Sequence, residues 1–72
     1  MSEPQPEKLS YEQARAELAA VVERLESGAG TLEESLALWE RGEQLADVCQ
    51  RWLDGARERL DSARAARTAR DA

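Results

Sequence analysis

The sequence predicts an all-α protein, an antiparallel two-helix hairpin over residues 9–66 that packs like a coiled coil. Its first helix is expected to be short and its second long. Apolar residues recur at alternating spacings of three and four along two segments, and no stretch alternates with period two as a strand would. Gly28 and Gly30 separate the two segments in a chain otherwise rich in helix formers. With 72 residues, the chain has room for one small domain.

Residues 1–8 are expected to be a disordered leader, because two prolines and polar or charged neighbours dominate this stretch. The first helix is expected over residues 11–27. Ser10 is a favourable N-cap, and Gln13 follows three residues later, which is the spacing of a capping box. Gly28 can adopt the left-handed conformation that ends a helix.

A turn over residues 28–31 is expected to lead into the second helix, over residues 32–66. Thr31 and Glu34 repeat the capping-box spacing at its start. No proline occurs in this half of the chain, so no stop signal interrupts the helix. Residues 67–72 are expected to be a frayed tail of arginine and alanine.

The apolar positions of the two helices predict the core of the hairpin, since residues at these spacings share one face of a helix. The seam of the second helix is expected to comprise Leu32, Ser35, Trp39, Gly42, Ala46, Cys49, Leu53, Ala56, Leu60 and Ala63, with Leu38, Leu45 and Trp52 beside it. The expected hairpin core comprises Tyr11, Leu18, Val21, Val22, Leu25, Leu36, Trp39, Gly42, Leu45, Ala46 and Cys49.

The unequal lengths of the helices predict an interaction surface. At ~1.5 Å per residue the first helix would be about 25 Å long and the second about 50 Å. If position i of the first helix faces roughly position 58 − i of the second, the second has no partner within the chain beyond about Cys49. Exposed Trp and Leu side chains usually mark an interface. The expected partner interface comprises Trp52, Leu53, Ala56 and Leu60.

Charge is distributed unevenly along the chain, whose net charge is −5. Residues 1–54 carry five basic and twelve acidic groups, a net charge of −7, whereas residues 55–72 carry five arginines and three acids, a net charge of +2. Proteins bind DNA largely by neutralising phosphates, so the acidic half would repel it. Any DNA contact is therefore expected to be weak or indirect, and the arginines are best interpreted as a solvated helix end.

Composition also indicates the compartment. The single cysteine cannot form an internal disulfide, which favours a reducing environment. No apolar run approaches the ~18 residues of a membrane span, and the first residues, MSEPQPEK, contain no apolar stretch of a signal peptide. We expect a cytoplasmic protein with no membrane partner.

Catalysis by this chain itself is not expected. The sequence contains no histidine, the commonest general base. Cys49 lies on the apolar seam with no histidine to activate it, so a structural thiol is the favoured interpretation. Carboxylates alternate with arginines at helical spacings, as in Asp47 and Arg51, which is typical of solvated ion pairs. No cofactor, metal or catalytic residue is expected.

The order of these features resembles a known family. The chain reads LSYEQARAELAAVVERLESG and then LEESLALWERGEQLADVCQRWLD, which is similar over roughly residues 9–60 to the small subunit of bacterial exodeoxyribonuclease VII. The resemblance implies a complex that degrades single-stranded DNA from both ends into oligonucleotides without needing a divalent metal. It also implies that a large subunit performs catalysis, and that several copies of the small subunit bind and support it.

Other functions stay open on the sequence alone. A generic acidic helical hairpin, adaptor-like or antitoxin-like, would bind a different protein. A small helical enzyme of the chorismate-mutase kind would need inward-pointing Arg and Lys, whereas the seam up to Ala63 is apolar or small, with Ser35 its one polar residue. Self-association through the end of the second helix is a further alternative.

Overall fold

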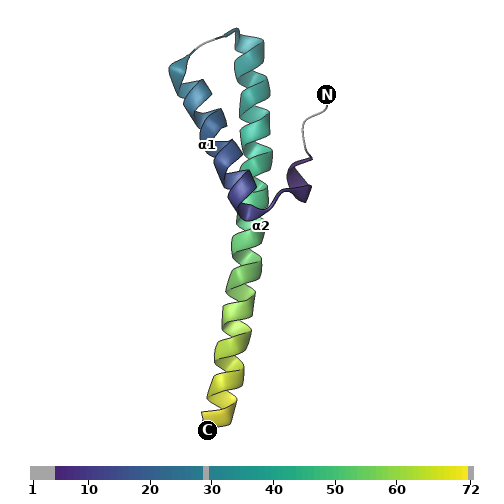
Figure 1. Ribbon diagram of the computed structural model, residues 1–72, viewed down its shortest axis with the longest axis vertical. Helices are drawn as coiled ribbons and strands as arrows, with labels where there is room; N and C mark the ends of the chain where they lie inside the picture. Colours follow the sequence, from purple (N-terminus) through teal and green to yellow (C-terminus); the bar gives the residue numbers. More distant parts are fainter. Residues whose placement is uncertain (1–4, 29, 72) are drawn as a thin grey trace.

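The structure, a computed structural model, describes residues 5–28 and 30–71. These residues form a short 3-10 helix, η1 (Pro6–Lys8), and two α-helices, α1 (Tyr11–Ser27) and α2 (Leu32–Asp71), with no strand among them. The two helices make an all-α hairpin in which α1 packs against the first half of α2, and α2 continues alone to the C-terminal end (Figure 1). The molecule is 61 Å along its longest axis and 25 by 15 Å across it.

The ends of α1 are fixed by local hydrogen bonds, and its bounds are those expected for the first helix. The backbone N–H of Gln13 donates to Ser10 Oγ at 3.1 Å, and the backbone N–H of Ser10 donates to Gln13 Oε1 at 2.9 Å. This reciprocal pair is a complete capping box. At the other end Gly28 has φ +67°, and its N–H donates to the carbonyl of Leu25 at 3.2 Å. Glycine adopts this left-handed conformation without the steric penalty that a Cβ would bring.

The start of α2 uses a similar device. The N–H of Glu34 donates to Thr31 Oγ1 at 3.1 Å, and the Thr31 hydroxyl donates to Glu34 Oε1 at 3.3 Å. Just before this cap, Gly30 has φ +101°, a conformation that residues with a Cβ rarely adopt. Residue 29, within the expected turn, lies outside the described residues.

The far end of α2 differs from the sequence prediction. The helix was expected to end near residue 66 and to fray over residues 67–72, but it continues to Asp71, and residue 72 lies outside the described part. Alanine and arginine are strong helix formers, and neither Gly nor Pro occurs here. Arg70 in the last turn also complements the negative end of the helix dipole.

The N-terminal leader also differs from the prediction of disorder over residues 1–8. Residues 1–4 lie outside the described residues, but Pro6–Lys8 form η1, which begins with proline, a residue well suited to a first helical position. The N–H of Leu9 donates to the carbonyl of Pro6 at 3.1 Å. The Leu9 side chain is buried in the core, so η1 is held against α2.

The core of the hairpin is small and lies where α1 and η1 meet the middle of α2. Gly42 brings the helices close, since a Cβ there would lie 3.4 Å from Val21 Cγ1. The buried residues are Leu9, Ala14, Val21, Leu45 and Val48, with Leu18, Leu25, Leu38 and Cys49 partly buried against them.

An ion pair between Arg41 and Glu17 joins the two helices at the edge of this core. Arg41 donates to Glu17 Oε1 from Nε at 2.9 Å and from Nη2 at 2.6 Å. The two side chains are 13% and 31% exposed, so the pair is shielded from solvent more than a typical surface pair. Positions 17 and 41 satisfy the facing relation expected from the sequence, since they add to 58.

Part of the expected core is exposed. Val21 and Leu45 are buried, Leu18, Leu25 and Cys49 pack against them, and Tyr11 and Gly42 are half-buried. The prediction was wrong for four residues, which are exposed: Val22, Leu36, Trp39 and Ala46. The physical reason is helical phase. The core formed with α1 includes Leu38 and Leu45, which were expected beside the seam, and Trp52 of the same series donates to the carbonyl of Leu9, so the expected seam is turned partly toward solvent.

We predict opposite effects of the same substitution at two glycines. Gly28→Ala should lower the free energy of unfolding by about 1 kcal/mol, because φ is positive there. Gly55→Ala, inside α2, should raise it by about 1 kcal/mol through helix propensity. A Cβ at either position would meet no atom within 4 Å, so the difference in stability between the two variants does not come from side-chain packing. Urea denaturation followed by circular dichroism measures both, and equal stability of the two variants would contradict this account of the turn.

Candidate protein-interaction site

The second half of α2 has no neighbouring element among the described residues. In Figure 1, α1 and η1 lie beside the upper part of α2, and the lower part stands alone. From residue 53 to residue 71 every residue is exposed except Gly55, which is half-buried. This half of α2 is the candidate site, since its apolar residues have no partner within the described part of the chain.

Trp52 marks the boundary between the covered and the free part of α2. The helix lengths predicted no partner for Trp52 within the chain, and this prediction was wrong. Its indole N–H donates to the carbonyl oxygen of Leu9 at 3.1 Å, across 43 positions of sequence. Its side chain is nevertheless 50% exposed. The free part of α2 therefore begins after Trp52 rather than after Cys49, and the indole ring contributes to both parts.

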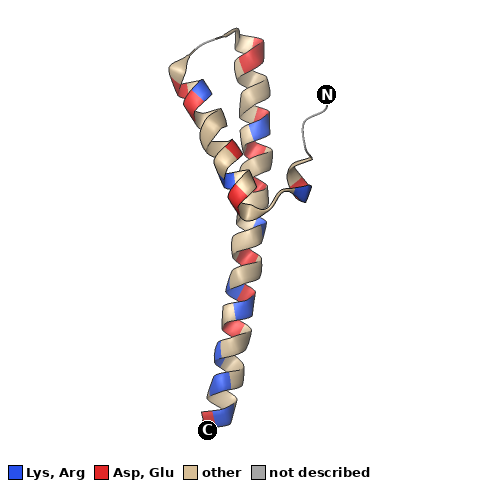
Figure 2. Cartoon of the chain, viewed as in Figure 1, with Lys and Arg blue, Asp and Glu red and all other residues tan. Residues whose placement is uncertain are grey.

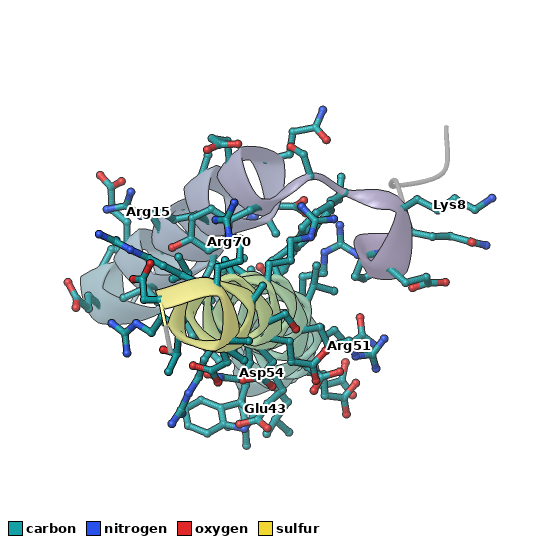
Figure 3. All side chains as sticks on the ribbon, turned by 90° about the horizontal axis from the view of Figure 1, so that it is seen from below. Lys8, Arg15, Glu43, Arg51, Asp54 and Arg70 are labelled. Atoms are coloured by element: carbon teal, nitrogen blue, oxygen red, sulfur yellow. The ribbon has the colours of Figure 1, made fainter. Side chains whose placement is uncertain are left out.

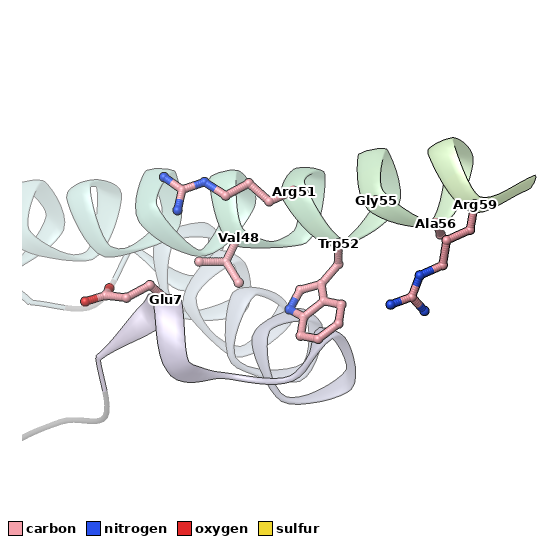
Figure 4. Close-up of a pocket in the computed structure, with 7 residues that line it drawn as sticks. All are labelled: Glu7, Val48, Arg51, Trp52, Gly55, Ala56 and Arg59. Atoms are coloured by element: carbon pink, nitrogen blue, oxygen red, sulfur yellow. The ribbon is translucent and has the colours of Figure 1, made fainter. Parts of the chain in front are cut away.

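A shallow pocket of 310 Å³ lies where the N-terminal segment meets α2 (Figure 4). In Figure 4 the Trp52 ring and the Arg59 side chain leave α2 toward the same side, with Gly55 and Ala56 between them. The missing side chain at Gly55 leaves the floor open, as a Cβ there would meet nothing within 4 Å. The residues that line the pocket are Glu7, Val48, Arg51, Trp52, Gly55, Ala56 and Arg59.

The pocket combines an apolar floor with charged groups at its rim. Arg51 is held by Asp47 at 2.6 Å, an exposed i,i+4 pair that adds little stability by itself. Arg51 precedes Trp52 in the sequence and Arg59 follows it, and both arginines line the pocket. Glu7 also lines the pocket, so the charged groups around it are of both signs. The apolar residues can accept an apolar side chain of a partner, and Arg59 can bind a carboxylate beside it.

The structure brings together two of the four residues expected at the partner interface. Trp52 and Ala56 line the pocket, whereas Leu53 and Leu60 lie beside it with 49% and 64% of their surface exposed. The contribution of η1 through Glu7 was missed, because the leader was expected to be disordered. Pro6 and Leu9 were the local signals that could have indicated an ordered segment.

The charges of the described residues are spread over the helix surfaces rather than gathered into one cluster (Figure 2). Seen along α2, Glu43 and Asp54 lie on the side away from α1 and η1, and Arg51 lies toward the η1 side (Figure 3). Arginines become frequent in the lower part of α2. Residues 1–54 therefore have a net negative charge, and residues 55–72 a net positive one.

Reactive groups are few in the described part of the chain. Cys49 is a free thiol, half-buried and packed against the core. Over residues 5–28 and 30–71, no group of three or more His, Cys, Asp or Glu side chains could hold a metal ion. Within the same residues, neither helix has the length and apolar character needed to cross a membrane.

A family model and several related proteins match this chain, and all carry the name of the same nuclease subunit. A family described as exonuclease VII small subunit matches residues 11–62. The chain is similar to proteins named exodeoxyribonuclease 7 small subunit. It is 75% identical over 57 residues to that of Beutenbergia cavernae, covering 79% of this chain and 66% of the relative. It is 73% identical over 55 residues to that of Streptomyces avermitilis, covering 76% and 69%.

A third relative, from Streptomyces coelicolor, is 74% identical over 57 residues, which cover 79% of this chain and 65% of the relative. The chain thus spans about two thirds of the length of these relatives, and slightly less for two of the three. No solved structure matches it.

Loss of the indole N–H at position 52 should weaken the attachment of the N-terminal segment. Trp52→Phe keeps an aromatic ring but leaves the Leu9 carbonyl without this donor, so the free energy of unfolding should fall by about 1 kcal/mol. Trp39→Phe is the matched control at a 60% exposed ring, and at concentrations where the chain is monomeric the change should stay within about 0.5 kcal/mol. Chemical denaturation of both variants checks the prediction, and equal losses would contradict an anchoring role for Trp52.

Proposed function

The chain belongs to the family of exonuclease VII small subunits, and we propose that it is the non-catalytic accessory subunit of such a nuclease. In this proposal a large subunit carries the catalytic residues and degrades single-stranded DNA from both ends into oligonucleotides. The small subunit binds the large one and supports it. The family match over residues 11–62 carries the proposal, because it includes α1, the turn and about half of the free part of α2.

The large subunit is proposed to bind the free part of α2, through Trp52, Leu53, Ala56 and Leu60. The three large residues of this set are 49% to 64% exposed, and such residues gain most from burial in an interface. The pocket beside Trp52 would receive an apolar side chain of the partner. Arg51 and Arg59 at its rim favour a partner surface that places carboxylates next to that side chain.

Several small subunits are proposed to bind each large one, as the family resemblance implies. The slender form of this chain is compatible with such an arrangement, since it is only 25 by 15 Å across its long axis. Copies could lie next to one another along an extended partner.

DNA is proposed to contact the large subunit rather than this chain. Residues 1–54, which include the whole hairpin core, carry a net charge of −7 and would repel phosphates. The arginines of α2 allow at most a weak or indirect contact. We propose a cytoplasmic location for the complex and no cofactor on this chain.

Reconstitution tests the proposal. The chain should be co-expressed with the candidate large subunit from the same genome and purified through a tag on the large one. Degradation of single-stranded DNA is then assayed in EDTA. A stable complex whose activity or solubility is lost without this chain is the expected result. Failure of the two chains to associate would contradict the accessory role.

A pair of identical substitutions tests where the large subunit binds. Ala56→Glu places a charge in the proposed interface and should weaken the complex about tenfold or more. Ala65→Glu, nine residues further along α2, lies on the opposite face and should leave affinity unchanged. Both positions are exposed and helical, so neither change should disturb the fold. Pull-down titration against the tagged large subunit measures the difference, and equal affinities would exclude this interface.

A further inference from the structure

A second apolar series runs along α2 and is not covered by α1. Leu38 and Leu45 pack in the core with α1, and Trp52 donates to the carbonyl of Leu9 just before α1, which leaves the neighbouring series turned toward solvent. Its large members are strongly exposed, with Leu32 at 77% and Trp39 at 60%. The series repeats every seven residues over almost thirty residues of helix, and we call it the outer heptad series: Leu32, Trp39, Ala46, Leu53 and Leu60.

Small residues accompany the outer heptad series at the intervening positions. They also repeat every seven residues and follow the first series by three: Ser35, Gly42, Cys49, Ala56 and Ala63. Together the two series form the alternating three-and-four spacing of a coiled-coil seam. Gly42 and Cys49 lie at the edge of this seam that borders α1 and are half-buried, since a Cβ on Gly42 would lie 3.4 Å from Val21 Cγ1 and Cys49 packs against the core. Four of the five residues of the outer heptad series have large apolar side chains, and Ala46 is the exception. All five residues of the accompanying series are small. A helix of this kind packs best against a partner whose large residues meet its small ones.

We propose that this seam is covered by a second copy of the same chain, arranged antiparallel. Position i of one copy then faces roughly position 95 − i of the other. In this register large residues meet small ones in four pairs: Leu32 with Ala63, Ser35 with Leu60, Trp39 with Ala56, and Gly42 with Leu53. At the centre two small residues meet, Ala46 and Cys49. A parallel pair would instead set Trp39 against Trp39 and Gly42 against Gly42, with crowded and empty layers in alternation.

Charge favours the same arrangement. The end of α2, residues 62–71, carries three arginines and one aspartate, a net charge of +2. In the antiparallel register it reaches the hairpin tip of the other copy, residues 22–36, which carries four glutamates and one arginine, a net charge of −3. A parallel pair would place the two acidic tips together. Opposite charges at both ends therefore select the antiparallel orientation.

The mass of the free chain in solution is the first test. Sedimentation equilibrium of the full chain over a range of concentrations should give a species of twice the mass of one chain. Leu60→Glu should weaken this association about tenfold or more, because it puts a charge into the seam at a position that does not contact α1. Ala65→Glu, on the far face of α2, is the matched control and should associate like the natural chain. A chain that stays monomeric at all concentrations would overturn the proposal.

Cross-linking tests the orientation. Ser35→Cys and Leu60→Cys are made in separate chains, each with Cys49→Ala, so that each chain has a single thiol. Under mild oxidation the mixture of the two should form a disulfide-linked dimer, because positions 35 and 60 face each other in the antiparallel register. Each variant alone should link poorly. Linking of each variant to itself would indicate a parallel pair and would overturn the proposal. The test needs no large subunit, so its outcome is independent of the accessory role.

Discussion

The packing of α1 on α2 is limited by length, since α1 has 17 residues and α2 has 40. The contact buries five residues, with Leu45 and Ala14 fully enclosed and Leu9, Val21 and Val48 around them. A core of this size gives a small chain only modest stability. The rest of α2 cannot be covered from within the described chain, so its apolar residues stay exposed. Any partner that binds only the folded hairpin would stabilise it by mass action.

The sequence allowed the helix caps to be predicted but not the face on which α1 packs. The capping boxes and the glycine stop depend on residues three or four positions apart, so local chemistry decides them. The packing face depends on a choice between two apolar series, one through Leu38 and Leu45 and the other through Trp39 and Ala46. Both series repeat every seven residues, and periodicity cannot rank them. The structure shows the first one buried, with Val48 extending it, which is why Trp39 and Ala46 were placed wrongly in the core.

The N-terminal segment was not predictable for a related reason. Its order depends on contacts across the fold: Leu9 enters the core, and the Leu9 carbonyl accepts the Trp52 indole N–H from 43 positions away. A composition rich in proline and charge indicates disorder when such a contact is unknown. The same contact gives the candidate site its shape, because η1 supplies Glu7 to the pocket whose apolar floor includes Val48 and Trp52. Sequence reasoning could find the free part of α2 from helix lengths alone, but not the pocket at its edge.

The two faces of the free part of α2 are not independent. Trp52 and Ala56 line the pocket, while Leu53 and Leu60 belong to the outer heptad series, and all four lie within nine residues of one helix. A large subunit that covers all four must displace a second copy from the seam. The two assemblies would then compete for Leu53 and Leu60, and the stronger binder would determine which forms at a given concentration. In the absence of the large subunit, the proposed pairing of two copies would cover the exposed leucines, where an uncovered apolar series would promote aggregation. Competition of this kind requires that the interface with the large subunit be stronger than the pairing of two small subunits.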